Sequence, residues 1–185
     1  MNFDDFASLV RARRTHMFVD PERPVPTEVV QQLCELVQWA PNHKRTWPAR
    51  FCVVTGEGRA RLGDVAADAM AAAGDAPERV EKTRKKYLRT LTSLIIGTAP
   101  GDSPTRTEEN RDSVACGVQN LLLGAQALGI ATYWGSCPKG ANDAIAELAG
   151  FEPGTHITAM LYLGWADGRD VAVPERPAVE LHHLA

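Results

Sequence analysis

The most informative segment of the chain reads NLLLGAQALGIATYWGS, at residues 120–136. Residues 114–128 are apolar on nearly every face, which is typical of a helix in the centre of a domain. Gly129 then ends the helix, because glycine readily adopts the left-handed conformation found after helix C-termini. Residues 131–137 have the pattern of a strand. The segment therefore predicts a buried helix that leads directly into a strand.

Hydrophobic periodicity predicts further elements on both sides of this segment. Three more strands are expected at residues 50–55, 93–98 and 157–164. Further helices are expected from residue 3 to near residues 13–15, from residue 27 until Pro41 stops the helix, at about residues 59–73, and at residues 142–149. The alternating charges of residues 77–92 indicate an exposed helix or a lid, and residues 100–107 a turn-rich polar loop. Neither a repeat nor a linker interrupts the pattern, so we expect residues 1–185 to form a single domain of the α+β or α/β class.

Composition excludes several classes of protein. A formal net charge of −3 offers no basic surface for nucleic acid. The N-terminus lacks the basic and apolar regions of a signal peptide, and no apolar run approaches the length of a membrane span. The four cysteines are widely separated, and the histidines form no zinc motif, so no metal is expected. We therefore expect a cytoplasmic protein with reduced thiols.

Three short segments carry residues suited to ligand binding. The first, Arg13-Arg14-Thr15, is either a water-facing helix end or an anion site, since an arginine fork beside a hydroxyl suits a phosphate. Asn42-His43 is either a plain connection or a pair of groups that hydrogen-bond a heteroaromatic cofactor. In Trp134-Gly135-Ser136, glycine allows a close approach to the backbone, while the indole can close one side of a ligand.

These segments, in this order, resemble the nitroreductase family of flavoproteins, and in particular its compact single-domain branch. The family opens with Arg-Arg-Ser/Thr, as at residues 13–15. The branch continues with Trp-Ala-Pro-Asn-His-Lys, as at residues 39–44, and with an Arg-Phe strand, as at residues 50–51. Its later helix and strand correspond to residues 120–134. Each motif alone is weak, but four in register are together fairly specific.

The resemblance implies an α/β/α sandwich with a mainly antiparallel sheet, a homodimer, and FMN at the subunit interface. Arg13, Arg14 and Thr15 would then bind the phosphate and ribityl chain. Asn42 and His43 would reach the flavin of the partner subunit, and Trp134, Gly135 and Ser136 would lie along the isoalloxazine ring. Arg169 stands where relatives often place a further cation for the phosphate, although the local match is poor.

The resemblance also implies an activity. NADH or NADPH would reduce the flavin, which would pass hydride to a nitroaromatic, a quinone or a related electrophile in a ping-pong cycle, without a catalytic side chain. The alternative is a protein that binds or stores FMN without turnover. The chain departs from the branch at Trp47, which replaces an acid, at Ala49, which replaces a tryptophan, and at Met17, where an arginine is frequent. These departures bear on substrate preference more than on flavin binding.

Overall fold

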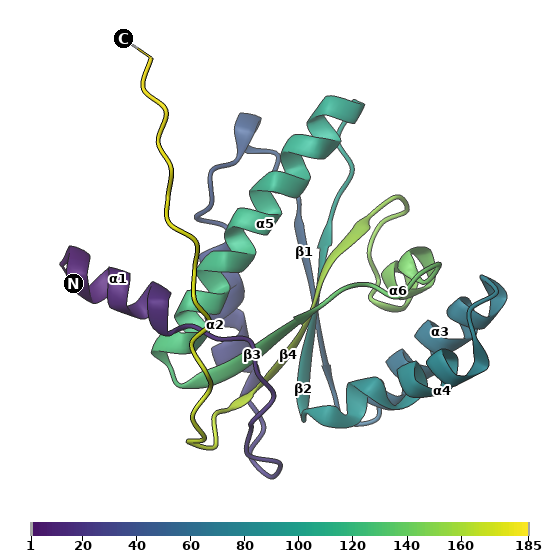
Figure 1. Ribbon diagram of the computed structural model, residues 1–185. Helices are drawn as coiled ribbons and strands as arrows, with labels where there is room; N and C mark the ends of the chain where they lie inside the picture. The colour runs from purple at the N-terminus through teal and green to yellow at the C-terminus, as the bar shows by residue number, and fades with distance from the viewer. Residues whose placement is uncertain (1, 185) are drawn as a thin grey trace.

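A four-stranded antiparallel sheet lies between two layers of helices (Figure 1). The computed structural model describes residues 2–184. The strands are β1 (Ala49–Thr55), β2 (Thr92–Thr98), β3 (Ile130–Gly135) and β4 (His156–Trp165). Their order across the sheet is β1-β2-β4-β3, so β3 is an edge strand. This arrangement confirms the predicted fold class, an α/β/α sandwich around an antiparallel sheet.

The central strands of the sheet, β2 and β4, are largely buried on both faces. All seven residues of β2 are buried, as is typical of a central strand covered by helices on both sides. Because side chains alternate along a strand, Leu94 and Ile96 belong to one core cluster and Ile95 to the other. The two clusters hold the two helical layers against the sheet.

The first layer consists of α2 (Thr27–Val37) and α5 (Pro104–Ala127). The two helices approach closely where Gly117 faces the last turn of α2: a Cβ on this glycine would lie 2.6 Å from the carbonyl oxygen of Val37. The helix α5 begins at Pro104, with the Ser103 side chain accepting a hydrogen bond from the backbone N–H of Arg106. The prediction of a loop at residues 100–107 is therefore wrong from Pro104 onward.

The second layer consists of α3 (Gly58–Ala72) and α6 (Asn142–Leu148), with α4 (Pro77–Lys86) packed on the outside of α3 (Figure 1). A short 3₁₀ helix, η2 (Tyr87–Arg89), continues α4 toward the sheet. A Cβ on Gly63 of α3 would overlap the backbone of Arg84 in α4. The guanidinium of Arg84 contacts carboxylates of Asp64 and Asp68, each at 2.9 Å. These contacts fix the position of α4, which is largely exposed as predicted.

The helix α1 (Phe3–Ala12) lies outside both layers and contacts α5. A capping box between Asn2 and Asp5 stabilises its first turn. None of its residues is buried, and the side chain of Phe3 is 78% exposed. Beyond β4, the chain from residue 169 to residue 184 forms neither helix nor strand and extends away from the sheet (Figure 1). Within residues 2–184, we find no helix long and apolar enough to cross a membrane.

Candidate functional site

The Arg13–Thr15 segment lies beside the edge strand β3. The helix α1 ends at Ala12, and the chain then runs parallel to β3, where Thr15 forms a bridge with Thr132. The backbone N–H of His16 donates to the carbonyl oxygen of Thr132 over 3.2 Å. Trp134–Ser136 follow on the same strand within four residues, about 13 Å of extended chain. The structure therefore brings two of the three predicted segments together along β3.

Arg13 is a partly buried cation without a carboxylate partner. None of the ion pairs formed within residues 2–184 involves it, and its Nη1 donates only a long hydrogen bond, 3.4 Å, to the hydroxyl of Thr15. Burial lowers the pKa of its guanidinium, and the charges of Arg14 and Arg176 lower this pKa further. An excess of positive charge of this kind favours a bound anion. Arg176 comes from the C-terminal tail and was not predicted.

Arg14 faces a different environment from Arg13. Its Nη1 donates to the carbonyl oxygens of Arg11 and Arg13, while its Nε is buried without a partner among the described residues. It lines, with Arg11, His16 and Arg169, a cavity of about 500 Å³ between α1 and the C-terminal tail. The unpaired Nε and the four basic side chains make this cavity an alternative site for an anion, separate from Arg13 and Thr15, which do not line it.

Arg169 is a weaker candidate for the phosphate. Its Nε donates to Oδ2 of Asp167 over 2.8 Å, so its charge is already balanced. The guanidinium also stacks over the ring of Phe18, at 4.3 Å from the ring centroid. Asp167 and Phe18 therefore hold Arg169 in place, although it still lines the cavity between α1 and the tail.

Trp134, Gly135 and Ser136 form the floor of a second cavity, of about 550 Å³, which we call the α4 cleft. Its other walls are α4, η2 and residues 137–139. Trp134 is 38% exposed. A Cβ on Gly135 would lie 3.4 Å from both the carbonyl oxygen of Met160 and the ring of Tyr162, which is ordinary van der Waals contact. The end of β3 thus presents an indole, a glycine and a hydroxyl to one open cavity.

Asn42 organises the loop that carries it. Its Nδ2 donates to the hydroxyl of Thr46 over 3.0 Å, and its Oδ1 accepts from the backbone N–H of Trp47 over 3.0 Å. The hydroxyl of Thr46 donates in turn to Oδ1 of Asn110 over 2.7 Å, and the amide of Asn110 reaches the carbonyl oxygen of Ala99. This chain of bonds attaches the loop to α5 and to the end of β2.

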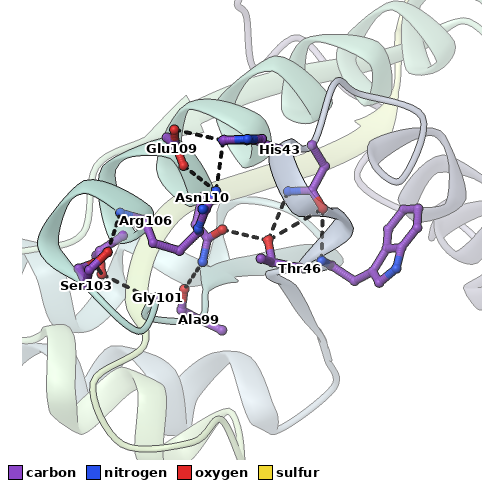
Figure 2. A network of polar contacts seen from close by, with 11 residues as sticks. His43, Thr46, Ala99, Gly101, Ser103, Arg106, Glu109 and Asn110 are labelled. Atoms are coloured by element: carbon purple, nitrogen blue, oxygen red, sulfur yellow. Dashed lines mark hydrogen bonds and ion pairs between the residues drawn. The ribbon is translucent and has the colours of Figure 1, made fainter.

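His43 is exposed and lies next to two charged residues of α5 (Figure 2). Its Nδ1 is 2.9 Å from Oε1 of Glu109 and 2.9 Å from Nη1 of Arg106. One imidazole nitrogen cannot donate to the carboxylate and accept from the guanidinium at once, so these contacts are alternatives. The hydrogen bond from His43, together with Arg106, lowers the pKa of Glu109. Nε2 has no partner among the described residues and remains available to a ligand.

The backbone between these two residues and β1 is strained. Lys44, Arg45 and Trp47 have φ values of 64°, 54° and 49°, a left-handed region that non-glycine residues rarely adopt. Each such residue is disfavoured by about 1–3 kcal/mol, and such residues cluster at functional sites. Trp47 is 52% exposed beside Asn42, whereas Ala49 is partly buried against the α2–α5 core. The two sequence departures therefore have different surroundings.

The structure does not join the two halves of the predicted site. The cavity that Asn42 lines contains no residue of β3, and the hydrogen bonds of Asn42 and His43 with described residues go to their own loop and to α5. Within residues 2–184, no group of three His, Cys, Asp or Glu side chains is arranged to hold a metal ion. A single chain therefore presents two separate surfaces, one cationic along β3 and one strained and polar at the start of α5.

Comparison with known proteins identifies the family. The sequence profile described as the nitroreductase family matches residues 10–165. YdjA of Escherichia coli K12, provisionally named an NAD(P)H nitroreductase, is 29% identical over 143 residues, covering 76% of this chain and 78% of YdjA. YfhC of Bacillus subtilis 168, provisionally named in the same way, is 26% identical over 164 residues, covering 86% and 83%.

Solved structures share the fold. A nitroreductase-like protein from Bacillus cereus superposes with a TM-score of 0.77 at 23% identity, covering 97% of this chain and 93% of the other. The FMN-dependent nitroreductase NfnB from Mycobacterium smegmatis, in complex with NADPH, superposes with a TM-score of 0.71 at 21% identity, covering 95% and 96%. At these identities the likeness concerns the fold.

Proposed function

The chain belongs to the nitroreductase family, and from this premise we propose that it is an FMN-dependent oxidoreductase. With FMN bound, it transfers hydride from NADH or NADPH to a nitroaromatic, a quinone or a related electrophile in a ping-pong cycle. The names of YdjA and YfhC, and the FMN-dependent relative NfnB in complex with NADPH, support an oxidoreductase that uses these cofactors.

The observation that carries the proposal is the unpaired charge of Arg13 beside β3. Its guanidinium lies near two other arginines, and no carboxylate among the described residues balances it. A phosphate dianion beside Arg13 and Thr15 would remove this repulsion and supply acceptors for both side chains. Arg14 and Arg176 are the next candidates to contact the same phosphate.

The other end of the cofactor is assigned to the end of β3. From Thr132, next to the proposed phosphate site, the chain continues to Trp134, Gly135 and Ser136. The ribityl chain would connect these two places. Gly135 leaves room for a flat ring because it has no Cβ. The indole of Trp134 shields one side of the ring from water, and the hydroxyl of Ser136 can hydrogen-bond its polar edge.

We further propose that the working unit is a homodimer in which Asn42 and His43 of the partner subunit complete each site. The separation of these residues from β3 within one chain supports this arrangement. Exposed aromatic side chains support it as well, since Phe3 is 78% and Trp39 83% exposed, and large exposed apolar groups commonly mark interfaces. The strained loop at residues 44–47 would then position Asn42 and His43 for the neighbouring site.

The chemistry needs no nucleophile or paired carboxylates from the protein. When bound, FMN would supply the redox chemistry, which is the transfer of hydride from the nicotinamide to the acceptor. The side chains bind and orient: Arg13 and Thr15 hold the phosphate, and Trp134 excludes water from the ring. Because the side chains only bind and orient the cofactor, the site consists mainly of cations and hydrogen-bond donors.

The visible absorption spectrum of the purified protein tests the proposal. We expect a flavin spectrum that NADPH bleaches without oxygen, FMN in the supernatant after denaturation, and steady-state NADPH oxidation when a quinone is added. Released FAD, or a colourless protein that FMN does not reconstitute, contradicts the cofactor assignment. A yellow protein that does not turn over with either nicotinamide donor would instead be a flavin-binding or storage protein.

A further inference from the structure

The α4 cleft is lined by five basic side chains and by no carboxylate. Arg79, Lys82 and Lys86 come from α4, Arg89 from η2 and Lys139 from the loop after β3. Only Arg79 forms an ion pair within residues 2–184, at 3.2 Å from the nearly buried Asp75. The cleft is therefore strongly cationic in a chain whose formal net charge is −3.

Acidic residues near α4 contact the opposite side of this helix. Arg84, which does not line the cleft, contacts the carboxylates of Asp64, Asp68 and Glu81 at distances of 2.9, 2.9 and 3.2 Å. The charges of α4 are thus sorted: Arg84, which faces α3, is neutralised, whereas Lys82 and Lys86, which line the cleft, have no carboxylate partner among the described residues. A helix that was merely solvated would not require this separation.

Lys86 is the cation closest to the floor of the cleft. Its Nζ lies 3.8 Å from the position that a Cβ on Gly135 would occupy. The side chain is partly buried, and burial together with the charge of Arg89 lowers its pKa. A partly buried ammonium without a partner is unfavourable, and an anion bound in the cleft would remove this penalty.

We propose that the α4 cleft binds the phosphate groups of a ligand whose reactive end lies over Trp134–Ser136. This proposal rests on the proposed function, because a ligand can react above Trp134–Ser136 only if the flavin ring lies there. Several converging ammonium and guanidinium groups match a pyrophosphate or phosphomonoester better than a single carboxylate. Two ligands have this chemistry: the nicotinamide donor, with its pyrophosphate, and a phosphorylated acceptor.

Binding measurements on the FMN-loaded protein test the proposal. The probes are inorganic pyrophosphate and NADP⁺, titrated by isothermal calorimetry. The double variant Lys82→Gln/Lys86→Gln removes two charges from the cleft but keeps most of the side-chain length. Lys85→Gln is the matched control, because Lys85 lies on the same helix and does not line the cleft. Lys139→Gln, in a loop outside α4, provides a second test if the double variant does not fold.

We expect the double variant to bind pyrophosphate at least about tenfold more weakly than the wild type, since one charge-assisted hydrogen bond alone accounts for that factor. If the variant also binds NADP⁺ more weakly, the ligand of the cleft is the nicotinamide donor. If NADP⁺ binding is unchanged while pyrophosphate binding is weaker, the ligand is a phosphorylated acceptor. Unchanged pyrophosphate binding overturns the proposal, and so does an equal loss in Lys85→Gln. The FMN content of each preparation is read separately, so a failure of the flavin assignment is distinguished from a failure of the cleft.

Discussion

Replacing Arg13 by alanine is expected to weaken FMN binding by about 1.5–3 kcal/mol, roughly ten- to a hundredfold in Kd. This is the range for one hydrogen bond to a charged group. Thr15→Val removes a neutral hydroxyl from the same site, and its expected effect is smaller, about 0.5–1.5 kcal/mol.

The structure separates this loss of binding from a loss of stability. In the absence of ligand, the guanidinium of Arg13 makes one long hydrogen bond, 3.4 Å, to Thr15 and no ion pair with a described residue. The neighbouring charges of Arg14 and Arg176 oppose it. Removing Arg13 therefore breaks no stabilising pair, and we expect the free energy of unfolding of the apo-protein to change by less than about 0.5 kcal/mol.

The assay is a titration of apo-protein with FMN, followed by quenching of flavin fluorescence, with urea unfolding of the same preparations. Arg169→Ala is the control, because Asp167 already pairs with this arginine, and its Kd should remain close to that of the wild type. If Arg13→Ala binds FMN as tightly as the wild type while Arg169→Ala does not, the phosphate lies in the cavity between α1 and the tail, and our assignment is wrong.

Three further predictions concern packing, assembly and substrate preference. Gly117→Ala should lower the free energy of unfolding by about 1–3 kcal/mol in a urea titration, because its Cβ would lie 2.6 Å from the Val37 carbonyl oxygen. In Gly58→Ala the nearest side-chain atom is at 3.5 Å, so this control should lose little or nothing. Light scattering should give about twice the chain mass of 20.1 kDa, and a monomer that keeps reducible FMN at low micromolar concentration would refute the shared site. Trp47→Glu with Ala49→Trp should change the ratio of kcat/KM values for a quinone and a nitroaromatic while leaving FMN content unchanged; lost flavin with an unchanged ratio would assign these residues to the cofactor site or the core.

Most of the fold could be predicted because its core is built from strongly patterned segments. Residues 93–98 are apolar on both faces, and the strand they form is buried on both faces. The start of α5 cannot be predicted from periodicity, because residues 105–113 are all polar or charged and show no apolar pattern. The available signal was local, since Ser103 caps the helix and Pro104 occupies its first position.

The site could be predicted only in part. The motif at residues 13–15 indicated an anion site, but nothing in the pattern of the tail pointed to Arg176, which approaches Arg13 only through the tertiary fold. The charges of residues 77–92 predicted an exposed helix, which is correct for α4 but not for Tyr87, Thr90 and Thr92, which are buried. The contacts of Gly63 and Arg84 set the rotation of α4 and so decide which of its charged side chains face β3. Such contacts between helices cannot be predicted from composition or periodicity.

Residues 15–19 pair with residues more than one hundred positions later in the sequence, and this affects the order of folding during synthesis. Thr15 pairs with Thr132, and Val19 forms a bridge with Ala166. During synthesis, the arginines leave the ribosome more than one hundred residues before the strand against which they lie. Contacts between residues so far apart form late in folding. A nascent chain that ends before β3 lacks the strand against which the arginines lie, so we expect the proposed FMN to bind only after β3 has been synthesised.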